Sequence, residues 1–280
     1  MNKLIALLTI ILCCNLPISA QESEEMPLGM TMPIDSLLNE WKTRTNLIYD
    51  TDCTNSAVIP QFSDSIYIDR LQRMPTIMEM PYNAIVREYI DRYAVKLRNQ
   101  VSVMLAANNF YMPLFEEALD AYDLPLELKY LPIIESALKP TARSRAGALG
   151  LWQFMLKTGR LYGLESNSLV DDRLDPIKAT WAAARYLREM YDIYQDWHLV
   201  IAAYNCGPGN VNKAIKRANK GTDYWAIYNY LPRETRGYVP AFIAATYIMN
   251  YYCDHGITPM QASLPAESDT IVVQKQVKFS

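Results

Sequence analysis

One glutamate of this chain lies where its environment would suit acid catalysis. The helix predicted from about residue 126 carries leucines at steps of three and four residues around Glu135, namely Leu128, Leu131 and Leu138. A carboxyl group among leucines loses hydration, which disfavours its charged form and raises its pKa. Such a group can donate a proton near neutral pH, so Glu135 is the candidate general acid. The alternative is a Glu135 at the edge of the stripe, reaching solvent or a buried arginine.

The residues after Glu135 favour a carbohydrate cleft. Ser136 follows directly, and Gly147 and Gly150 precede a second element that begins with Leu151, Trp152, Gln153 and Phe154. Glycines let the backbone approach a ligand, while an amide between aromatic rings suits the hydroxyls and the apolar face of a sugar. Trp152 could line the cleft or anchor its helix, and for Phe154 we expect the core.

Two tyrosines further along the chain are also candidates. Tyr204 and Asn205 stand at the end of a predicted apolar helix, before the turn Gly207-Pro208-Gly209. They could form a rim that contacts ligand, or a plain helix C-terminus. Tyr238 opens the last long helix and could equally be a core aromatic.

Three segments in this order, IIES, GALGLWQF and AAYNCGPGN, resemble the signature motifs of the lytic transglycosylase (SLT) domain family, and most of all its membrane-bound D type. The resemblance covers residues 82–256. It implies an all-α, lysozyme-like multi-helix fold similar to goose-type lysozyme. It also implies non-hydrolytic cleavage of the β-1,4 MurNAc-GlcNAc bond of peptidoglycan, which closes a 1,6-anhydro ring.

The roles that follow from this resemblance concern one acid and a set of sugar contacts. Glu135 would be catalytic, and Tyr238, which matches a fourth motif, would orient it. Ser136, Gln153, Tyr204 and Asn205 would hold the sugar, with Gly150, Leu151 and Trp152 as further cleft lining. Leu156 and Cys206 depart from the family pattern and put the fine cleft geometry in doubt.

No second catalytic carboxylate is evident from the sequence. Glu127 would lie about 12 Å from Glu135 along the same helix, and the acidic residues of the 165–175 loop are expected to be solvated. Ordinary glycosidases use two carboxylates, so a single one favours attack by the substrate itself. A lysozyme-type hydrolase and a non-catalytic glycan-binding protein on the same fold are the alternatives.

Composition excludes other classes of function. The net charge of -3 is too small and of the wrong sign for nucleic-acid binding. Neither His198 nor His255 has a neighbouring ligand at zinc-like spacing, so no metal or other cofactor is expected. The expected partner is the peptidoglycan glycan strand, and the protein is expected to be a monomer.

The first 20 residues have the layout of a secretory signal peptide: Lys3, an apolar run, and small residues before Gln21. Export to the periplasm is therefore expected. Acylation of Cys13 or Cys14, with attachment to the outer membrane, competes with plain secretion. Cys53, Cys206 and Cys253 remain after cleavage, which permits one disulfide or none. For Cys206 a role as a small buried hydrophobe is favoured over a nucleophile.

The expected organisation is a signal peptide (1–20), an irregular arm (21–80), a catalytic domain (81–256) and an extended tail (257–280). Short helices are predicted at 33–41 and 67–74 in the arm, and an isolated strand at 271–279 in the tail. In the domain, helices are predicted at 82–107, 111–122, from 126 to a stop at 139–140, 151–162, 175–194, 197–204, 210–218 and 224–231, and then over a long segment after 233. Asp123 is expected to cap the helix that carries Glu135, and Pro132 to kink it.

Overall fold

The structure is a computed structural model that describes residues 53, 56, 58–219 and 223–260. Within these residues all regular structure is helical, and the β-pairing is confined to three isolated bridges. The all-α prediction is therefore confirmed. The predicted signal peptide, the 33–41 helix and the 271–279 strand lie outside the described residues. So does most of the predicted arm, but its end forms the helix α3.

The elements follow one another along the chain in a single series. They are α3 (Asp64–Arg73), α4 (Ala84–Asp91), the π-helical η1 (Arg92–Lys96), α5 (Arg98–Ala121), the 3-10 helix η2 (Leu126–Tyr130), α6 (Leu131–Ser136), α7 (Leu156–Leu161), η3 (Asp172–Leu174), α8 (Pro176–Tyr194), α9 (Trp197–Cys206), α10 (Pro208–Ala218), α11 (Tyr224–Ile227), η4 (Tyr228–Tyr230), α12 (Arg233–Arg236) and α13 (Tyr238–Tyr251). None of the helices within the described ranges is long and apolar enough to cross a bilayer.

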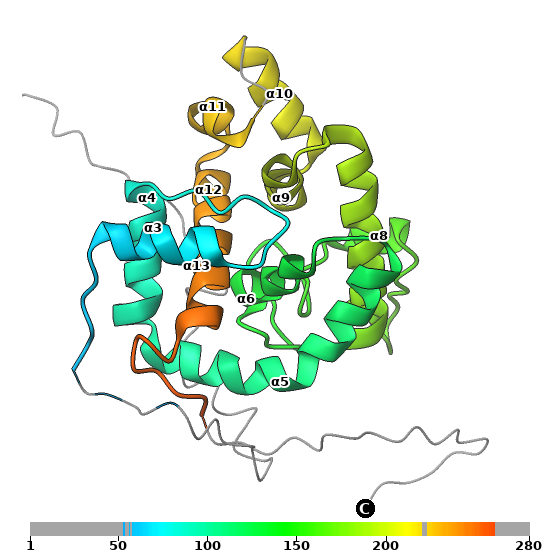
Figure 1. Ribbon diagram of the computed structural model, residues 1–280. Coiled ribbons are helices and arrows are strands. Elements are labelled where there is room, and N and C mark those ends of the chain that lie inside the picture. The colour runs from blue at the N-terminus through cyan, green and yellow to red at the C-terminus, as the bar shows by residue number, and fades with distance from the viewer. Residues whose placement is uncertain (1–52, 54–55, 57, 220–222, 261–280) are drawn as a thin grey trace, which may run out of the picture.

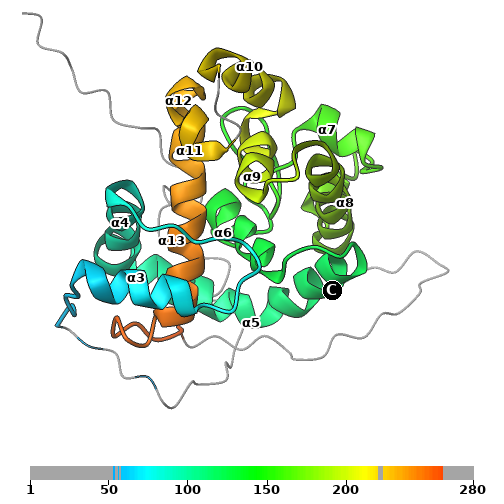
Figure 2. The ribbon, with the colours of Figure 1, turned by 45° about the horizontal axis from the view of Figure 1, so that its top comes forward.

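Helix α13 lies at the centre of the molecule. Its residues from Tyr238 to Met249 are all buried, as expected for a helix that is apolar around its whole circumference. Figures 1 and 2 show α13 running past α6, with α4 on one side and α9 on the other. The short α6 is thereby enclosed by longer helices, which hold it in place.

Capping explains the starts of some of the helices. The side chain of Asp175 accepts hydrogen bonds from Ile177 N and Lys178 N, and Pro176 opens α8 where its missing N–H costs nothing. Asn83 and Asp196 cap α4 and α9 in the same way. The predicted start of α8 at Asp175-Pro176 is confirmed.

Several predicted boundaries are wrong. The single helix predicted at 82–107 is three elements: α4, η1 and the start of α5. The apolar periodicity continues through all three because the π-helical turn adds one residue without exposing the apolar face. The predicted 111–122 helix is the second half of α5, which continues through Pro113. Of the 151–162 helix only α7 is helical.

The segment before Glu135 also differs from the expected kinked helix. It consists of the 3-10 helix η2 and then α6, and Pro132 stands in the first turn of α6 instead of its middle. Asp123 has a left-handed backbone, with φ of 52°, and does not cap the helix. Glu127 is buried and its Oε1 accepts a hydrogen bond of 2.5 Å from Met78 N, so it supports the fold and lies outside the cavity that holds Glu135.

Candidate active site

Glu135 lies in the last turn of α6. The helix ends one residue later because Ala137 and Leu138 have left-handed backbones, with φ of 49° and 60°, and their N–H groups bond back to Ile133 O and Pro132 O. The predicted stop at 139–140 is thus three residues late. Leu128, Leu131 and Leu138 are fully buried, which confirms the apolar surroundings of Glu135, but they do not share one helical face, because Leu128 lies in η2 and Leu138 lies beyond the end of α6.

The Glu135 carboxyl group is partly buried and has one hydrogen-bond donor. The Tyr238 hydroxyl, from the start of α13, donates to Glu135 Oε1. Burial raises the pKa of Glu135 to about 7, and the hydrogen bond from Tyr238 opposes this rise. No basic residue of the described chain forms an ion pair with Glu135. The carboxyl group is therefore poised between its acid and its base form near neutral pH.

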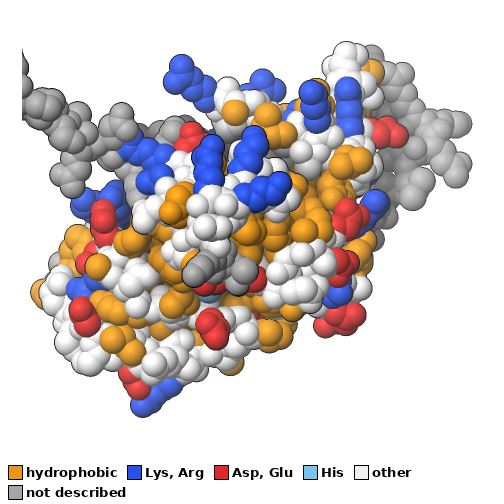
Figure 3. All heavy atoms as spheres, turned by 90° about the horizontal axis from the view of Figure 1, so that it is seen from above, with side chains coloured by type: hydrophobic (Ala, Val, Ile, Leu, Met, Phe, Trp, Pro, Cys, Tyr) orange, Lys and Arg blue, Asp and Glu red, His pale blue; other side chains and the backbone are white. Residues whose placement is uncertain are grey.

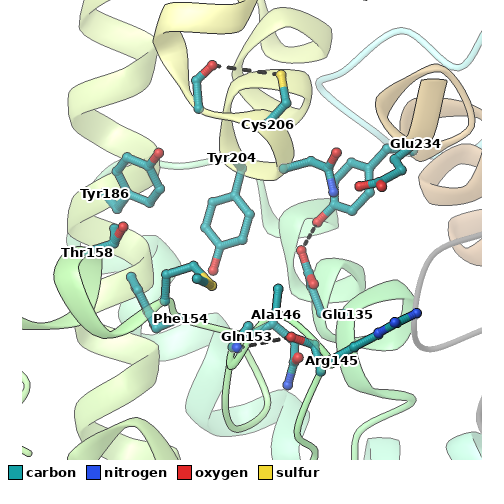
Figure 4. Close-up of a pocket in the computed structure, with 16 residues that line it drawn as sticks. Glu135, Arg145, Ala146, Gln153, Phe154, Thr158, Tyr186, Tyr204, Cys206 and Glu234 are labelled. Atoms are coloured by element: carbon teal, nitrogen blue, oxygen red, sulfur yellow. Dashed lines mark hydrogen bonds between the residues drawn. The ribbon is translucent and has the colours of Figure 1, made fainter. Parts of the chain in front are cut away.

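A cavity of about 780 Å³ opens above this carboxyl group. Figure 4 shows side chains from α6, α7, α8, α9 and the loop before α7 converging on it. Of the predicted site residues, Glu135, Gln153, Tyr204, Asn205 and Tyr238 line the cavity. These five residues come from four separate stretches of the chain, and the fold brings them together.

Tyr204 connects α9 to the turn that carries the second motif. Its hydroxyl donates a 2.7 Å hydrogen bond to Trp152 O, and Figure 4 shows the ring beside Glu135. Burial and the nearby Glu135 charge raise the pKa of Tyr204 well above its ordinary value. The phenol therefore stays protonated, and its oxygen remains available as an acceptor.

Gln153 uses its amide nitrogen within the protein. With a left-handed backbone (φ of 49°), it donates from Nε2 to Gly150 O at 2.7 Å and to Ala142 O at 3.1 Å. Its Oε1 is buried and has no hydrogen-bond partner among the described residues, and Gln153 as a residue borders the cavity. A ligand hydroxyl would satisfy this oxygen, because a buried acceptor without a donor is costly.

The predicted sugar contact of Ser136 does not agree with the structure. Ser136 is completely buried, and its hydroxyl lies 2.9 Å from both Pro132 O and Leu151 O. It joins α6 to the following loop, so its contribution is to position Glu135.

The predicted cleft lining by Gly150, Leu151 and Trp152 is also wrong. All three are buried and none borders the cavity. The Trp152 ring is in the core, where Nε1 donates to Thr180 Oγ1 at 2.9 Å. Gly150 has φ of +80°, and a Cβ there would stand 1.9 Å from Arg173 O.

Two residues lie at the boundary between core and cavity. Phe154 is only 3% exposed, as expected for a core residue, yet it also borders the cavity. Asn205 is exposed and also borders the cavity, and its Oδ1 accepts a 2.9 Å hydrogen bond from Thr235 Oγ1.

The loop around residues 171–175 is structural, which corrects the expectation of solvated charge. Arg173 is 6% exposed and pairs with Asp171 at 2.7 Å. Arg173 Nη1 also donates to Gly147 O and Phe154 O. Hydrogen bonds from Arg173 lower the pKa of Asp171 to about 2. This ion pair holds the glycine-containing turn against the start of α8.

The cysteines take one of the arrangements left open by the sequence. Cys53 and Cys253 form a disulfide, and Cys206 is a free thiol. Cys206 lies on the cavity wall and is partly exposed, so it is less buried than expected. Burial nonetheless raises the pKa of its thiol, which makes it a poor nucleophile.

The sequence analysis did not identify the remaining wall of the cavity. It consists of Ser144, Arg145, Ala146, Ala148, Met155, Thr158, Tyr186, Cys206, Gly207 and Glu234. Ala148, Cys206 and Gly207 lie inside the recognised motifs, and Ser144, Arg145, Ala146 and Met155 lie next to one, so position in or near a motif was the available signal. Glu234 precedes Tyr238 by four residues and is a second carboxylate on the wall.

Residues 113–227 match the family model of the transglycosylase SLT domain. Among relatives, the chain is 38% identical over 187 residues to "Membrane-bound lytic murein transglycosylase D" of Escherichia coli K12. This match covers 64% of this chain and 40% of that protein. The chain is also 30% identical over 135 residues to "Soluble lytic murein transglycosylase" of Escherichia coli K12, and this match covers 46% of this chain and 21% of that protein. The chain thus spans about two fifths of the length of the first of these relatives.

Among solved structures, the chain is similar to the 70 kDa soluble lytic transglycosylase Slt70 of Escherichia coli, with a TM-score of 0.45 and 23% identity. That match covers 61% of this chain and 30% of the Slt70 chain.

Proposed function

We propose that this protein is a peptidoglycan lytic transglycosylase, which cleaves the β-1,4 MurNAc-GlcNAc bond without water and leaves 1,6-anhydroMurNAc ends. The observation that carries the proposal is Glu135, a carboxyl group with a pKa of about 7 on the wall of a large cavity, held by the Tyr238 hydroxyl. The SLT domain match and relatives named as lytic murein transglycosylases support the reaction and the substrate class.

One carboxyl group can serve both halves of this reaction. Protonated Glu135 gives its proton to the bridging oxygen as the bond from that oxygen to MurNAc C1 breaks, which releases the GlcNAc 4-hydroxyl. The MurNAc C6 hydroxyl then bonds to C1, and its proton passes to the Glu135 carboxylate. The acid is restored, and no water is consumed. A pKa near the working pH suits a group that acts first as acid and then as base.

Neighbouring groups would orient the reactants. Burial and the adjacent Glu135 raise the pKa of Tyr238 well above its ordinary value, so its hydroxyl stays a donor to Oε1 and leaves Oε2 for the reacting proton. The Oε1 of Gln153 and the oxygen of Tyr204 would accept hydrogen bonds from sugar hydroxyls. Asn205, which also lines the cavity, would be a further contact to the sugar.

Glu234 favours a second candidate, a lysozyme-type hydrolase. Hydrolysis needs a base for the attacking water, and Glu234 is the other carboxylate on the cavity wall. The two reactions differ in their products, because the anhydro product is lighter by one water. With Glu234→Gln, a transglycosylase would still form the anhydro product, whereas a hydrolase would lose its base.

The organisation and location of the protein are part of the same proposal. Residues 81–256 would form the catalytic domain, between an N-terminal arm and a C-terminal tail. The predicted signal peptide and the relative named as membrane-bound support export to the periplasm. Attachment to the outer membrane would require acylation of Cys13 or Cys14.

Mass spectrometry of the products from purified sacculi tests the function. We expect anhydro-muropeptides from the wild type and a loss of about 10²-fold to 10⁴-fold in their release for Glu135→Gln, which keeps the shape and removes the acid. Glu117→Gln, an exposed change on α5, is the matched control and should behave as wild type. Hydrated reducing ends as the main product, or full activity of Glu135→Gln, would contradict the proposal.

A further inference from the structure

The chain is slightly acidic overall, but two of the segments that border the cavity are basic. Residues 136–164 include five basic residues and no acidic one: Lys139, Arg143, Arg145, Lys157 and Arg160. Residues 197–218 include three more, again with no acidic residue: Lys213, Lys216 and Arg217. Figure 3, viewed onto the face with α10 and α11, shows lysine and arginine side chains gathered there. Two of the segments that contribute to the cavity wall therefore carry an excess of positive charge.

Arg145 is the basic residue that reaches the cavity wall. It lies in the loop between Glu135 and the glycine turn, is exposed, and forms no ion pair with any residue that the structure describes. Figure 4 shows its side chain leaving the cavity on the side of Glu135 and pointing outwards. The guanidinium group is therefore placed to meet a part of the substrate that projects from the cavity next to the bond being cleaved.

From this placement we infer that Arg145 binds a carboxylate of the peptide attached to MurNAc and selects peptide-bearing strands. The inference rests on the proposed function, because it assigns a contact to the same substrate. The two sugars carry no charge once the lactyl group of MurNAc is joined to its peptide, so a cation beside the cavity gains little from the glycan itself. The peptide carries carboxylates, and an arginine fork matches a carboxylate in geometry and charge.

The other charges on the wall limit where a peptide carboxylate can be placed. Glu135 repels an anion inside the cavity when it is ionised. Arg145 is the cation of that wall, so the favourable position for an anion is outside the cavity next to this side chain. The contact is exposed, and its effect should weaken as salt concentration rises.

The test compares native sacculi with sacculi whose carboxylates have been converted to methylamides by carbodiimide coupling. For the wild type we expect release of anhydro-muropeptides to be about threefold to fivefold slower from the amidated sacculi, the scale of one exposed charge pair. Arg145→Gln should be slowed by the same factor on native sacculi and should be indifferent to amidation. Arg73→Gln, an exposed arginine change on α3, should respond as the wild type does.

Binding separates the failure of this inference from the failure of the proposed function. Glu135→Gln protein, with and without Arg145→Gln, is sedimented with both kinds of sacculi, which needs no turnover. We expect amidation to weaken binding only when Arg145 is present. The inference would be overturned if protein that retains Arg145 bound native and amidated sacculi equally. It would also be overturned if Arg145→Gln weakened binding to both kinds of sacculi by the same factor. Hydrated products together with amidation-sensitive binding would overturn the transglycosylase proposal and leave the contact standing.

Discussion

At Glu135 two effects act in opposite directions on one carboxyl group. Removal from water raises its pKa, and the hydrogen bond from Tyr238 stabilises the carboxylate and lowers it, with a result of about 7. The acid form is therefore present below about pH 7 and is lost above it. The rate of a cleavage that starts from the acid form should decline as pH rises through this value. The pH at which it declines should depend on the hydrogen bond from Tyr238.

Tyr238→Phe removes that donor and tests its part in the pH dependence. Without the hydrogen bond the pKa of Glu135 should rise, so the alkaline decline of kcat/KM should move to higher pH. The loss of orientation should also reduce kcat, by about tenfold. A pH–rate profile on sacculi measures both effects. Tyr247→Phe is the control, because Tyr247 lies on the same helix but is buried away from the cavity, with Arg70. If the alkaline decline of kcat/KM in Tyr238→Phe stayed at the same pH as in the wild type, Tyr238 would not act on the pKa of Glu135.

The raised pKa of Glu135 also has a cost in stability. Above the unfolded pKa of about 4.5 the folded state retains a proton that the unfolded state has lost, so stability falls as pH rises from about 4.5 towards 7. Glu135→Gln should remove this penalty and stabilise the protein by about 1 to 2 kcal/mol at pH 8, with little effect at pH 4. Thermal unfolding at the two pH values measures the difference. An equal effect at both would exclude this explanation.

Among the structural elements, the turn at residues 150–154 places Gln153 and Phe154 on the cavity wall. It is anchored from three helices: by the Ser136 hydroxyl of α6, by Thr180 of α8 through Trp152, and by the Tyr204 hydroxyl of α9. Residues predicted to touch sugar thus turn out to hold the turn. The exposed fraction of a motif residue cannot be read from its type, because an indole or a hydroxyl serves equally well in a sugar site and in a core.

Gly150→Ala tests how far the site depends on this turn. An added Cβ would stand 1.9 Å from the backbone oxygen of Arg173, and the residue would also need its present φ of +80°. We expect a loss of about 3 kcal/mol in unfolding free energy and a large loss of activity. Gly163→Ala is the matched control: its φ is +87° but nothing lies within 4 Å of the new Cβ, so it should cost only about 1 kcal/mol. Denaturant unfolding of both variants makes the comparison, and equal losses would show that backbone strain alone matters.

At the scale of the whole molecule, the end of α13 is tied to residues far away in sequence. The Cys53–Cys253 disulfide joins residues 200 positions apart. Arg98 reinforces this contact by donating hydrogen bonds to the backbone oxygens of His255, Gly256 and Ser56. These contacts hold the C-terminal end of the helix whose N-terminal end carries Tyr238.

Removal of the disulfide should therefore affect stability more than catalysis. With Cys53→Ser and Cys253→Ser together, we expect a loss of about 2 to 5 kcal/mol, because a long loop of the unfolded chain is released. Activity at 25 °C should be kept, since α13 separates the disulfide from Tyr238 by about 20 Å of helix. Thermal unfolding and product release measure the two effects, and Cys206→Ser is the control for cysteine loss alone. Loss of activity in the still folded double variant would contradict this separation.

The sequence alone determined the helical class, the apolar surroundings of Glu135 and the motifs whose residues line the cavity. The helical class and the surroundings follow from local periodicity and residue type, and the motifs follow from the resemblance to the SLT domain family; none of these depends on distant contacts. Only the tertiary structure decided that Ser136 and Trp152 point into the core, that Asp171 pairs with Arg173 under the glycine turn, and that Arg145 and Glu234 stand on the cavity wall. Those facts depend on which surfaces distant helices cover, and no local pattern in the chain encodes that.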